Sequence, residues 1–148
     1  MSHPIRQVLQ GKKELCRSVL ESLPEWFGIP RAIDDYVAEV GALPVFAVGA
    51  DGRDAGFVAL RESFEHACEI YVMGVMPALH RRGMGRALMQ AATDFATSHG
   101  YRVLYVKTLG SSRESEHYAA TRQFYEATGF VPVEELEGVW GQGNPCLI

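Results

Sequence analysis

The chain has 148 residues, of which 47% are hydrophobic, and a formal net charge of −4. This size and composition predict a single compact domain over residues 1–148 with a buried core, and they exclude an intrinsically disordered chain. The acidic balance argues against nucleic-acid binding, which generally needs a basic surface. The sequence shows neither an apolar run long enough for a membrane span nor a secretory signal, so a cytoplasmic protein is expected.

The three cysteines predict neither a disulfide framework nor a metal centre. Cys16, Cys68 and Cys146 are far apart in the sequence, and neither a CxxC pair nor zinc-type spacing of His and Cys occurs. Reduced and mostly buried thiols, as found in cytosolic proteins, are therefore the expected state.

The N-terminal half of the chain combines two helical patterns with short apolar runs. Leu15, Val19 and Leu20 recur at helical spacing, and Pro30 suits the first turn of the next helix. The turn residues Asp51–Gly52 separate two strand-like runs. The expected elements are a strand over 4–9, helices over 12–23 and 30–40, and strands over 43–48, 55–61 and 68–76.

The C-terminal half continues with two helices that each end at a glycine. The first runs from Gly83 to about His99, and Gly100 suits its C-terminal cap. The capping-box pattern of Ser111–Glu114 predicts a second helix, which starts there or a few residues later and ends at Thr128. A buried strand is expected over 103–107, with final strands over 130–136 and 145–148. Because strands and helices mix without strict alternation, the sequence predicts an α+β fold with a mixed sheet.

The segment His80–Leu88 lies where a strand-like run gives way to a helix. Gly83 and Gly85 have no Cβ, so a ligand can approach the backbone closely there. A helix start also offers unpaired N–H groups and the positive end of the helix dipole. The pattern, which includes three arginines, predicts an anion-binding loop; the alternative is an ordinary helix start with solvated arginines.

The element order and this loop resemble the GNAT superfamily of acyl-CoA-dependent N-acetyltransferases. The signature loop of that family reads Gln/Arg-x-x-Gly-x-Gly/Ala, and the window His80–Gly85 matches it with histidine in the first position. Arg122–Phe130 is similar to the aromatic-Tyr-Glu-x-x-Gly-Phe segment of the family. Many relatives carry asparagine seven residues before that tyrosine, where this chain has Tyr118. The resemblance covers most of the chain from about Val45 onward.

The resemblance implies a fold and a cosubstrate. The fold would be a mixed, mostly antiparallel central sheet flanked by helices and splayed between strands four and five. Acetyl-CoA would bind in that opening, with its pyrophosphate on loop N–H groups and its thioester and pantetheine arm on the fourth strand. No metal is implied. The expected donor-binding residues are Val75, Met76, Arg81, Arg82, Gly83, Met84, Gly85, Arg86, Ala87 and Tyr118.

The resemblance also implies roles for two catalytic candidates. Tyr125 would donate a hydrogen bond or a proton to the departing thiolate of coenzyme A; the alternative is an aromatic packing residue. Glu69 would accept the proton of the attacking amine. Glu62 and His66 compete with Glu69 for that role, and ordered water is a further alternative.

The acceptor site is expected between the two N-terminal helices and their connector, walled by Trp26, Phe27 and Tyr36, which could instead be core residues. The predicted reaction is direct acetyl transfer to a primary amine in a ternary complex, with a small-molecule amine as the first choice of acceptor. The alternatives are acetylation of a protein N-terminus or lysine, a non-catalytic acyl-CoA-binding module, and a nucleotide-binding domain. The oligomeric state stays open: family members often dimerise by pairing C-terminal strands, which makes a homodimer one possibility.

Overall fold

The computed structural model describes residues 3–80 and 82–148. The chain forms two compact units, the first ending at Leu104 and the second beginning at Tyr105. Within the described residues there are four α-helices and a five-stranded, mostly antiparallel sheet, so the predicted α+β class is confirmed. The expectation of one domain over 1–148 stays a prediction.

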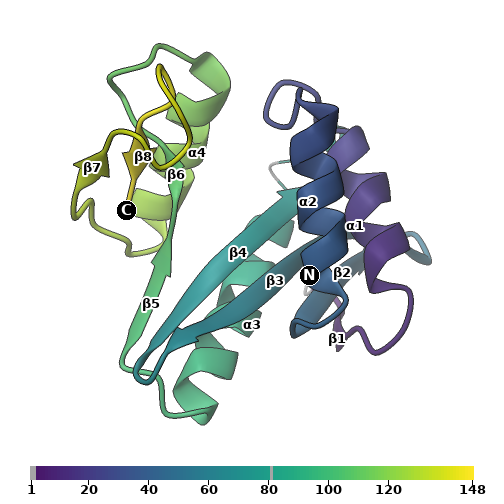
Figure 1. The fold of residues 1–148 in the computed structure, drawn as a ribbon. Helices are drawn as coiled ribbons and strands as arrows, with labels where there is room; N and C mark the ends of the chain where they lie inside the picture. Colours follow the sequence, from purple (N-terminus) through teal and green to yellow (C-terminus); the bar gives the residue numbers. More distant parts are fainter. Residues whose placement is uncertain (1–2, 81) are drawn as a thin grey trace. The chain divides into compact units, whose positions relative to one another are not determined.

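The elements of the first unit agree closely with those expected from the sequence (Figure 1). The helices are α1 (Lys12–Glu21), α2 (Pro30–Val40), the short 3-10 helix η1 (Pro77–Leu79) and α3 (Met84–Ser98). The strands are β1 (Ile5–Gln7), β2 (Val45–Ala50), β3 (Arg53–Phe64), β4 (Ala67–Val75) and β5 (Val103–Val106), which begins in this unit. Their order in the sheet is β1-β2-β3-β4-β5, with only β4 and β5 parallel.

The long antiparallel ladder between β3 and β4 contains a β-bulge. Ala59 pairs with Val72, but the next residue, Leu60, pairs with Ile70. Tyr71 is therefore the extra residue on β4. Such an insertion shifts the alternation of side chains between the two faces of a sheet, so residues before and after it change sides.

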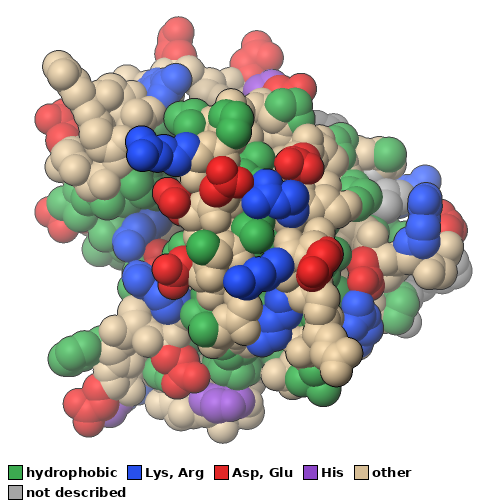
Figure 2. Space-filling model, turned by 45° about the vertical axis from the view of Figure 1, so that its right-hand side comes forward, with side chains coloured by type: hydrophobic (Ala, Val, Ile, Leu, Met, Phe, Trp, Pro, Cys, Tyr) green, Lys and Arg blue, Asp and Glu red, His purple; other side chains and the backbone are tan. Residues whose placement is uncertain are grey.

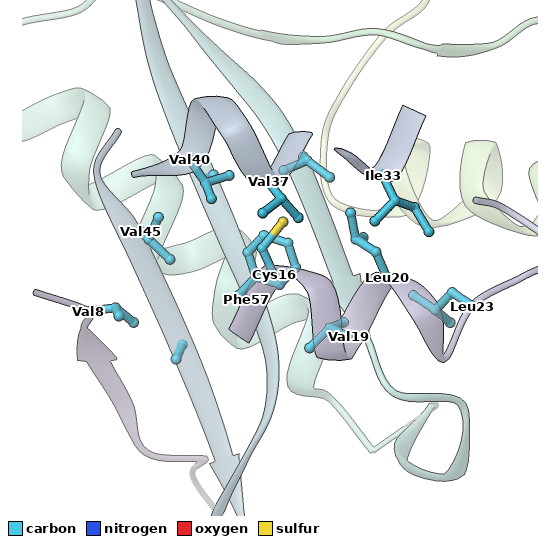
Figure 3. Packing of buried hydrophobic residues seen from close by; sticks show 13 residues of the cluster. Val8, Cys16, Val19, Leu20, Leu23, Ile33, Val37, Val40, Val45 and Phe57 are labelled. Atoms are coloured by element: carbon cyan, nitrogen blue, oxygen red, sulfur yellow. The ribbon is translucent and has the colours of Figure 1, made fainter. Parts of the chain in front are cut away.

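The core of the first unit lies between the sheet and the α1–α2 pair (Figure 3). Val19 and Leu20 of α1 are fully buried, as is Phe57 of β3 on the facing strand. On the opposite face, α3 covers the sheet (Figure 1) and buries Leu88 and Ala92. Amphipathic helices thus cover both faces of the sheet.

The outer surface of the α1–α2 pair is polar. Arg17 of α1 forms ion pairs with Asp34 of α2, at 3.0 Å, and with Glu21 of its own helix, at 3.6 Å. Figure 2 shows basic and acidic side chains interspersed over the face it presents. These exposed pairs neutralise charge locally and contribute little to stability.

The second unit differs from the sequence prediction in its strands. It contains β6 (Thr108–Leu109), α4 (Glu116–Ala127), β7 (Glu135–Leu136) and β8 (Cys146–Leu147), and its three short strands form an antiparallel sheet in the order β6-β8-β7. The strand expected over 103–107 ends at Val106, and its first residue, Val103, is exposed rather than buried. Of the strand expected over 130–136, only Glu135–Leu136 is assigned as a strand, although Val133 and Glu134 also form backbone hydrogen bonds with Ile148.

The predicted capping box at Ser111–Glu114 is wrong. Helix α4 starts later, and its N-cap is Ser115, whose hydroxyl accepts a hydrogen bond from the Tyr118 N–H at 3.3 Å. The alternative of a later start, also open from the sequence, is the one observed. Ser115 provides the same type of cap at a position where its backbone is extended.

The prediction of buried, reduced cysteines is confirmed. Cys16, Cys68 and Cys146 are all buried thiols. Burial raises the pKa of Cys16 to about 12, against the opposing effect of Arg17. Burial also raises the pKa of Cys68 to about 11, assisted by nearby carboxylates. In the part of the chain that the structure describes, no helix is long and apolar enough to cross a membrane.

We expect Leu20→Ala to lower the free energy of unfolding by about 2–5 kcal/mol, because it empties a fully buried site between α1 and the sheet. Leu9→Ala is the matched control, since the Leu9 side chain is 79% exposed and packs against little. Urea denaturation followed by circular dichroism measures both changes. Equal destabilisation by the two substitutions would contradict the assignment of the core.

Candidate functional site

The end of β4 presents a backbone carbonyl away from β3. The Met76 N–H donates to the Ala55 carbonyl of β3 at 2.8 Å. Backbone groups of successive strand residues point to alternate edges, so the Val75 N–H and carbonyl point to the other edge of β4. Pro77 then begins η1 and turns the chain back towards the strand it has just left.

The His80 side chain forms a hydrogen bond with the Val75 carbonyl. Its Nε2 lies 2.6 Å from the Val75 oxygen, which fixes Nε2 as the protonated nitrogen because a carbonyl only accepts. The His80 backbone N–H donates to the Pro77 carbonyl at 3.2 Å. The imidazole also contacts the Trp26 ring edge to face, with centroids 5.7 Å apart. The first residue of the loop motif thus joins the end of β4 to the α1–α2 connector.

The loop that follows leads into α3 through a left-handed glycine. Gly83 is the N-cap with a φ of 81°, and no side chain caps the helix. The first backbone hydrogen bond of the helix runs from the Ala87 N–H to the Gly83 carbonyl at 3.1 Å. The N–H groups of Met84, Gly85 and Arg86 have no acceptor within the helix and point out of its N-terminus. This geometry suits an anion.

The side chains of the loop divide between the core and solvent. Met84 is buried, whereas Arg82 and Arg86 are exposed. The ring of His3 contacts the Arg82 carbonyl. Arg81, also predicted to bind the donor, lies outside the described residues. The sequence prediction of a glycine-led helix start after a strand is confirmed.

Glu69 is buried in the sheet beside a cation. Gly74 lies against α1, and the bulge at Tyr71 reverses the alternation, so Glu69 also faces the α1–α2 side. Its side chain is 4% exposed. Arg61, opposite on β3, donates to Glu69 Oε1 through Nε at 2.9 Å and forms an ion pair through Nη2 at 2.6 Å. Arg61 therefore compensates a carboxylate that would be costly to bury alone.

A row of aromatic rings continues from this ion pair across the face of the sheet. The Arg61 guanidinium lies over the Tyr71 ring, 5.8 Å from its centroid, and Tyr36 packs on Tyr71 at 5.3 Å. Phe27 contacts Tyr36 at 5.9 Å. The predicted acceptor-site residues Phe27 and Tyr36 thus lie on the same face as Glu69, and Trp26 is adjacent in the connector.

The phenols of this row stay protonated well above neutrality. Burial raises the pKa of Tyr71 to about 12, and the charges of Glu39 and Glu69 and the Tyr36 phenol add to the effect while Arg61 opposes it. Burial also raises the pKa of Tyr36, with a further contribution from Glu69. Both groups can therefore donate hydrogen bonds at neutral pH.

The two competitors of Glu69 lie nearer the β3–β4 turn and are exposed. The Glu62 carboxylate accepts a hydrogen bond from the Tyr101 hydroxyl. The His66 carbonyl accepts from the N–H groups of Arg102 and Val103, so His66 takes part in the backbone structure there. Of the three candidates for the proton acceptor, Glu69 is the buried one.

The second unit carries Tyr118 and Tyr125 on α4, two helical turns apart and so on nearly one face. Tyr125 is half-buried and packs edge to face on Phe130, with centroids 5.5 Å apart. Its carbonyl accepts from the Phe130 N–H at 3.0 Å, in the turn that ends the helix. The spacing of tyrosine, glycine and phenylalanine in the motif therefore fits the end of a helix, where Phe130 packs back on Tyr125.

Sequence reasoning missed Arg61 and the contacts of His80. Arg61 is 8 residues from Glu69, and only the strand register shows that they are neighbours. The available signal was an arginine on one expected strand that could pair with a carboxylate on the next strand. Among residues 3–80 and 82–148, no group of three or more His, Cys, Asp or Glu side chains could hold a metal ion.

The fold and the loop define an acetyltransferase domain. Residues 36–132 match the family described as the acetyltransferase (GNAT) domain, which is more than half of the chain. The chain therefore belongs to the GNAT family, and the predicted resemblance is confirmed.

Three relatives show how far the similarity extends. The chain is 44% identical over 71 residues to a mycothiol acetyltransferase of Clavibacter michiganensis, covering 46% of this chain and 23% of the relative. The match therefore spans less than a quarter of that relative's length. A GNAT-family structure from Desulfovibrio desulfuricans superposes with a TM-score of 0.82 at 25% identity, covering 99% and 96% of the two chains. The PaiA N-acetyltransferase of Thermoplasma acidophilum, solved with coenzyme A, gives 0.73 at 16% identity, covering 99% and 98%.

We expect Arg61→Met to lower the free energy of unfolding by about 1–3 kcal/mol, because Glu69 stays buried without its cation. The double variant Arg61→Met/Glu69→Gln should recover part of the loss, which a double-mutant cycle measures. Arg17→Met, which breaks an exposed ion pair, is the control and should change stability little. Additive effects of the Arg61 and Glu69 substitutions would show that the pair is not energetically linked.

Proposed function

We propose that this chain transfers the acetyl group of acetyl-CoA to a primary amine. The observation that carries the proposal is the uncapped N-terminus of α3, entered through the left-handed Gly83, in a chain of the GNAT family. Its outward N–H groups suit the pyrophosphate of an acyl-CoA. Binding there involves the backbone from Arg82 to Ala87 together with Arg81. The coenzyme A in the Thermoplasma structure supports the choice of donor.

The proposed chemistry is a direct transfer. The amine nitrogen attacks the thioester carbon, the carbon–sulfur bond breaks, and coenzyme A leaves as a thiolate. Backbone groups of Val75 and Met76 would orient the thioester and the pantetheine arm. Tyr125 would donate a proton to the thiolate, and Tyr118 would line the arm. Glu69 would accept the amine proton, directly or through water.

We further propose a small-molecule amine as the acceptor. The mycothiol acetyltransferase similarity supports this choice, because that enzyme is named for a small-molecule product. Phe27 and Tyr36 offer aromatic surface on the face of the sheet that carries the buried Glu69 carboxylate, and Trp26 precedes Phe27 in the connector. A cationic amine would be attracted both by the carboxylate and by aromatic ring faces.

Isothermal titration of acetyl-CoA, with ATP as a control ligand, tests the donor site. We expect acetyl-CoA to bind and Gly83→Ala to weaken that binding at least about tenfold, since a Cβ would stand where the backbone meets the pyrophosphate. Gly100→Ala is the matched control: Gly100 has a φ of 78°, so it carries a similar backbone strain, and it lies at the far end of α3. Equal binding by both variants, or no heat from acetyl-CoA with the folded protein, would overturn the donor assignment.

Tyr125→Phe should lower the turnover number by about 100-fold or more while leaving the dissociation constant of acetyl-CoA within about twofold, because it removes only the proton donor. Steady-state release of coenzyme A thiol with a panel of small amines, combined with titration, separates the two effects. Phe124→Leu, on the same helix, controls for altered packing. Undiminished turnover in Tyr125→Phe would remove the phenol from the mechanism, and binding without turnover in every assay would favour the non-catalytic module.

A further inference from the structure

The Val75 carbonyl already accepts a hydrogen bond from a side chain of the same chain. Its oxygen lies at the edge of β4 that points away from β3, since Met76 makes the bond to β3. His80 Nε2 donates to that oxygen at 2.6 Å. The donor site proposed above needs the backbone at the end of β4 for the pantetheine arm, whose amide N–H groups seek carbonyl acceptors. The imidazole and the arm would therefore approach the same oxygen at the same edge of β4.

The position of His80 makes this overlap specific to the chain. Histidine stands where the family motif has Gln or Arg, and η1 returns the chain so that a side chain five residues after Val75 reaches its carbonyl. The ring is short and rigid, and it also packs edge to face on Trp26. The His80 backbone is fixed independently by its bond to Pro77. The side chain can therefore leave the carbonyl without unfolding the loop.

We propose that His80 is a placeholder for the pantetheine arm: its Nε2–H satisfies the Val75 carbonyl in the free enzyme and is displaced when acyl-CoA binds. The inference rests on the proposed function of the donor site. The displaced imidazole stays beside Trp26, in the connector that forms part of the proposed acceptor site. Donor binding would thus move a side chain that touches the acceptor side, so the first substrate alters the site of the second.

Nuclear magnetic resonance of the imidazole nitrogens tests the displacement on the unmodified protein. The free protein should show His80 with its proton on Nε2, and saturation with acetyl-CoA should shift the Nε2 signal as the carbonyl bond is lost. The nucleotide part alone, 3′-phosphoadenosine 5′-diphosphate, lacks the pantetheine amides and should leave that signal in place. An unchanged His80 signal at saturating acetyl-CoA would overturn the proposal, as would an equal shift with the nucleotide.

His80→Ala and His80→Gln give a second readout. Loss of the competing donor in His80→Ala should tighten acetyl-CoA binding about fivefold, the equivalent of one ordinary hydrogen bond, and leave binding of the nucleotide part unchanged. His80→Gln keeps an N–H donor and should bind acetyl-CoA like the unmodified protein. Weaker or unchanged acetyl-CoA binding by His80→Ala would contradict the placeholder role. Absence of acetyl-CoA binding by the unmodified protein would instead overturn the proposed function itself.

Discussion

The antiparallel pairing of β3 with β4 is the constraint on which the first unit depends. It determines which backbone groups at the end of β4 form hydrogen bonds with β3. The Met76 N–H donates to the Ala55 carbonyl, whereas the Val75 carbonyl points away from β3 and accepts from another donor. It also places Arg61 opposite Glu69. Both faces of these strands are covered by helices, so the pairing is held by burial as well as by hydrogen bonds.

The bulge at Tyr71 determines on which face of the sheet the Glu69 carboxylate lies. In a regular strand, Glu69 would lie six residues before Val75 on the same face as Val75, and so on the side of α3. The inserted residue moves Glu69 to the side of α1 and α2, where Tyr36 and Phe27 lie. Counting along the sequence predicted a carboxylate on this strand but could not predict its face, because a bulge has no clear sequence signal here. For the same reason, the sequence did not show that Arg61 lies opposite Glu69.

The sequence predicted an element accurately where residues within that element determine it, and poorly where pairing with distant residues does. Helices with periodic apolar faces and a proline or glycine at their ends, such as Pro30–Val40, were predicted almost to the residue. The short strands of the second unit were not, because apolar residues there do not imply a buried strand: Val131 and Val133 are both 74% exposed, and β7 is confined to Glu135–Leu136. The sequence also predicted that a helix begins at Gly83, whereas the partners of His80 depend on a turn whose geometry the sequence leaves open.

The loop motif contains one position that requires a particular backbone conformation and another that does not. The proposed anion site at the start of α3 would use backbone N–H groups and a residue with a positive φ, so it would require glycine at position 83 and tolerate varied side chains around it. The first position of the motif makes no such backbone demand, and a change to histidine leaves the loop intact. What that side chain controls is the carbonyl at the end of β4 and the contact with Trp26. A departure from the family pattern at His80 therefore bears on that carbonyl and on Trp26, whereas the start of α3 depends on Gly83.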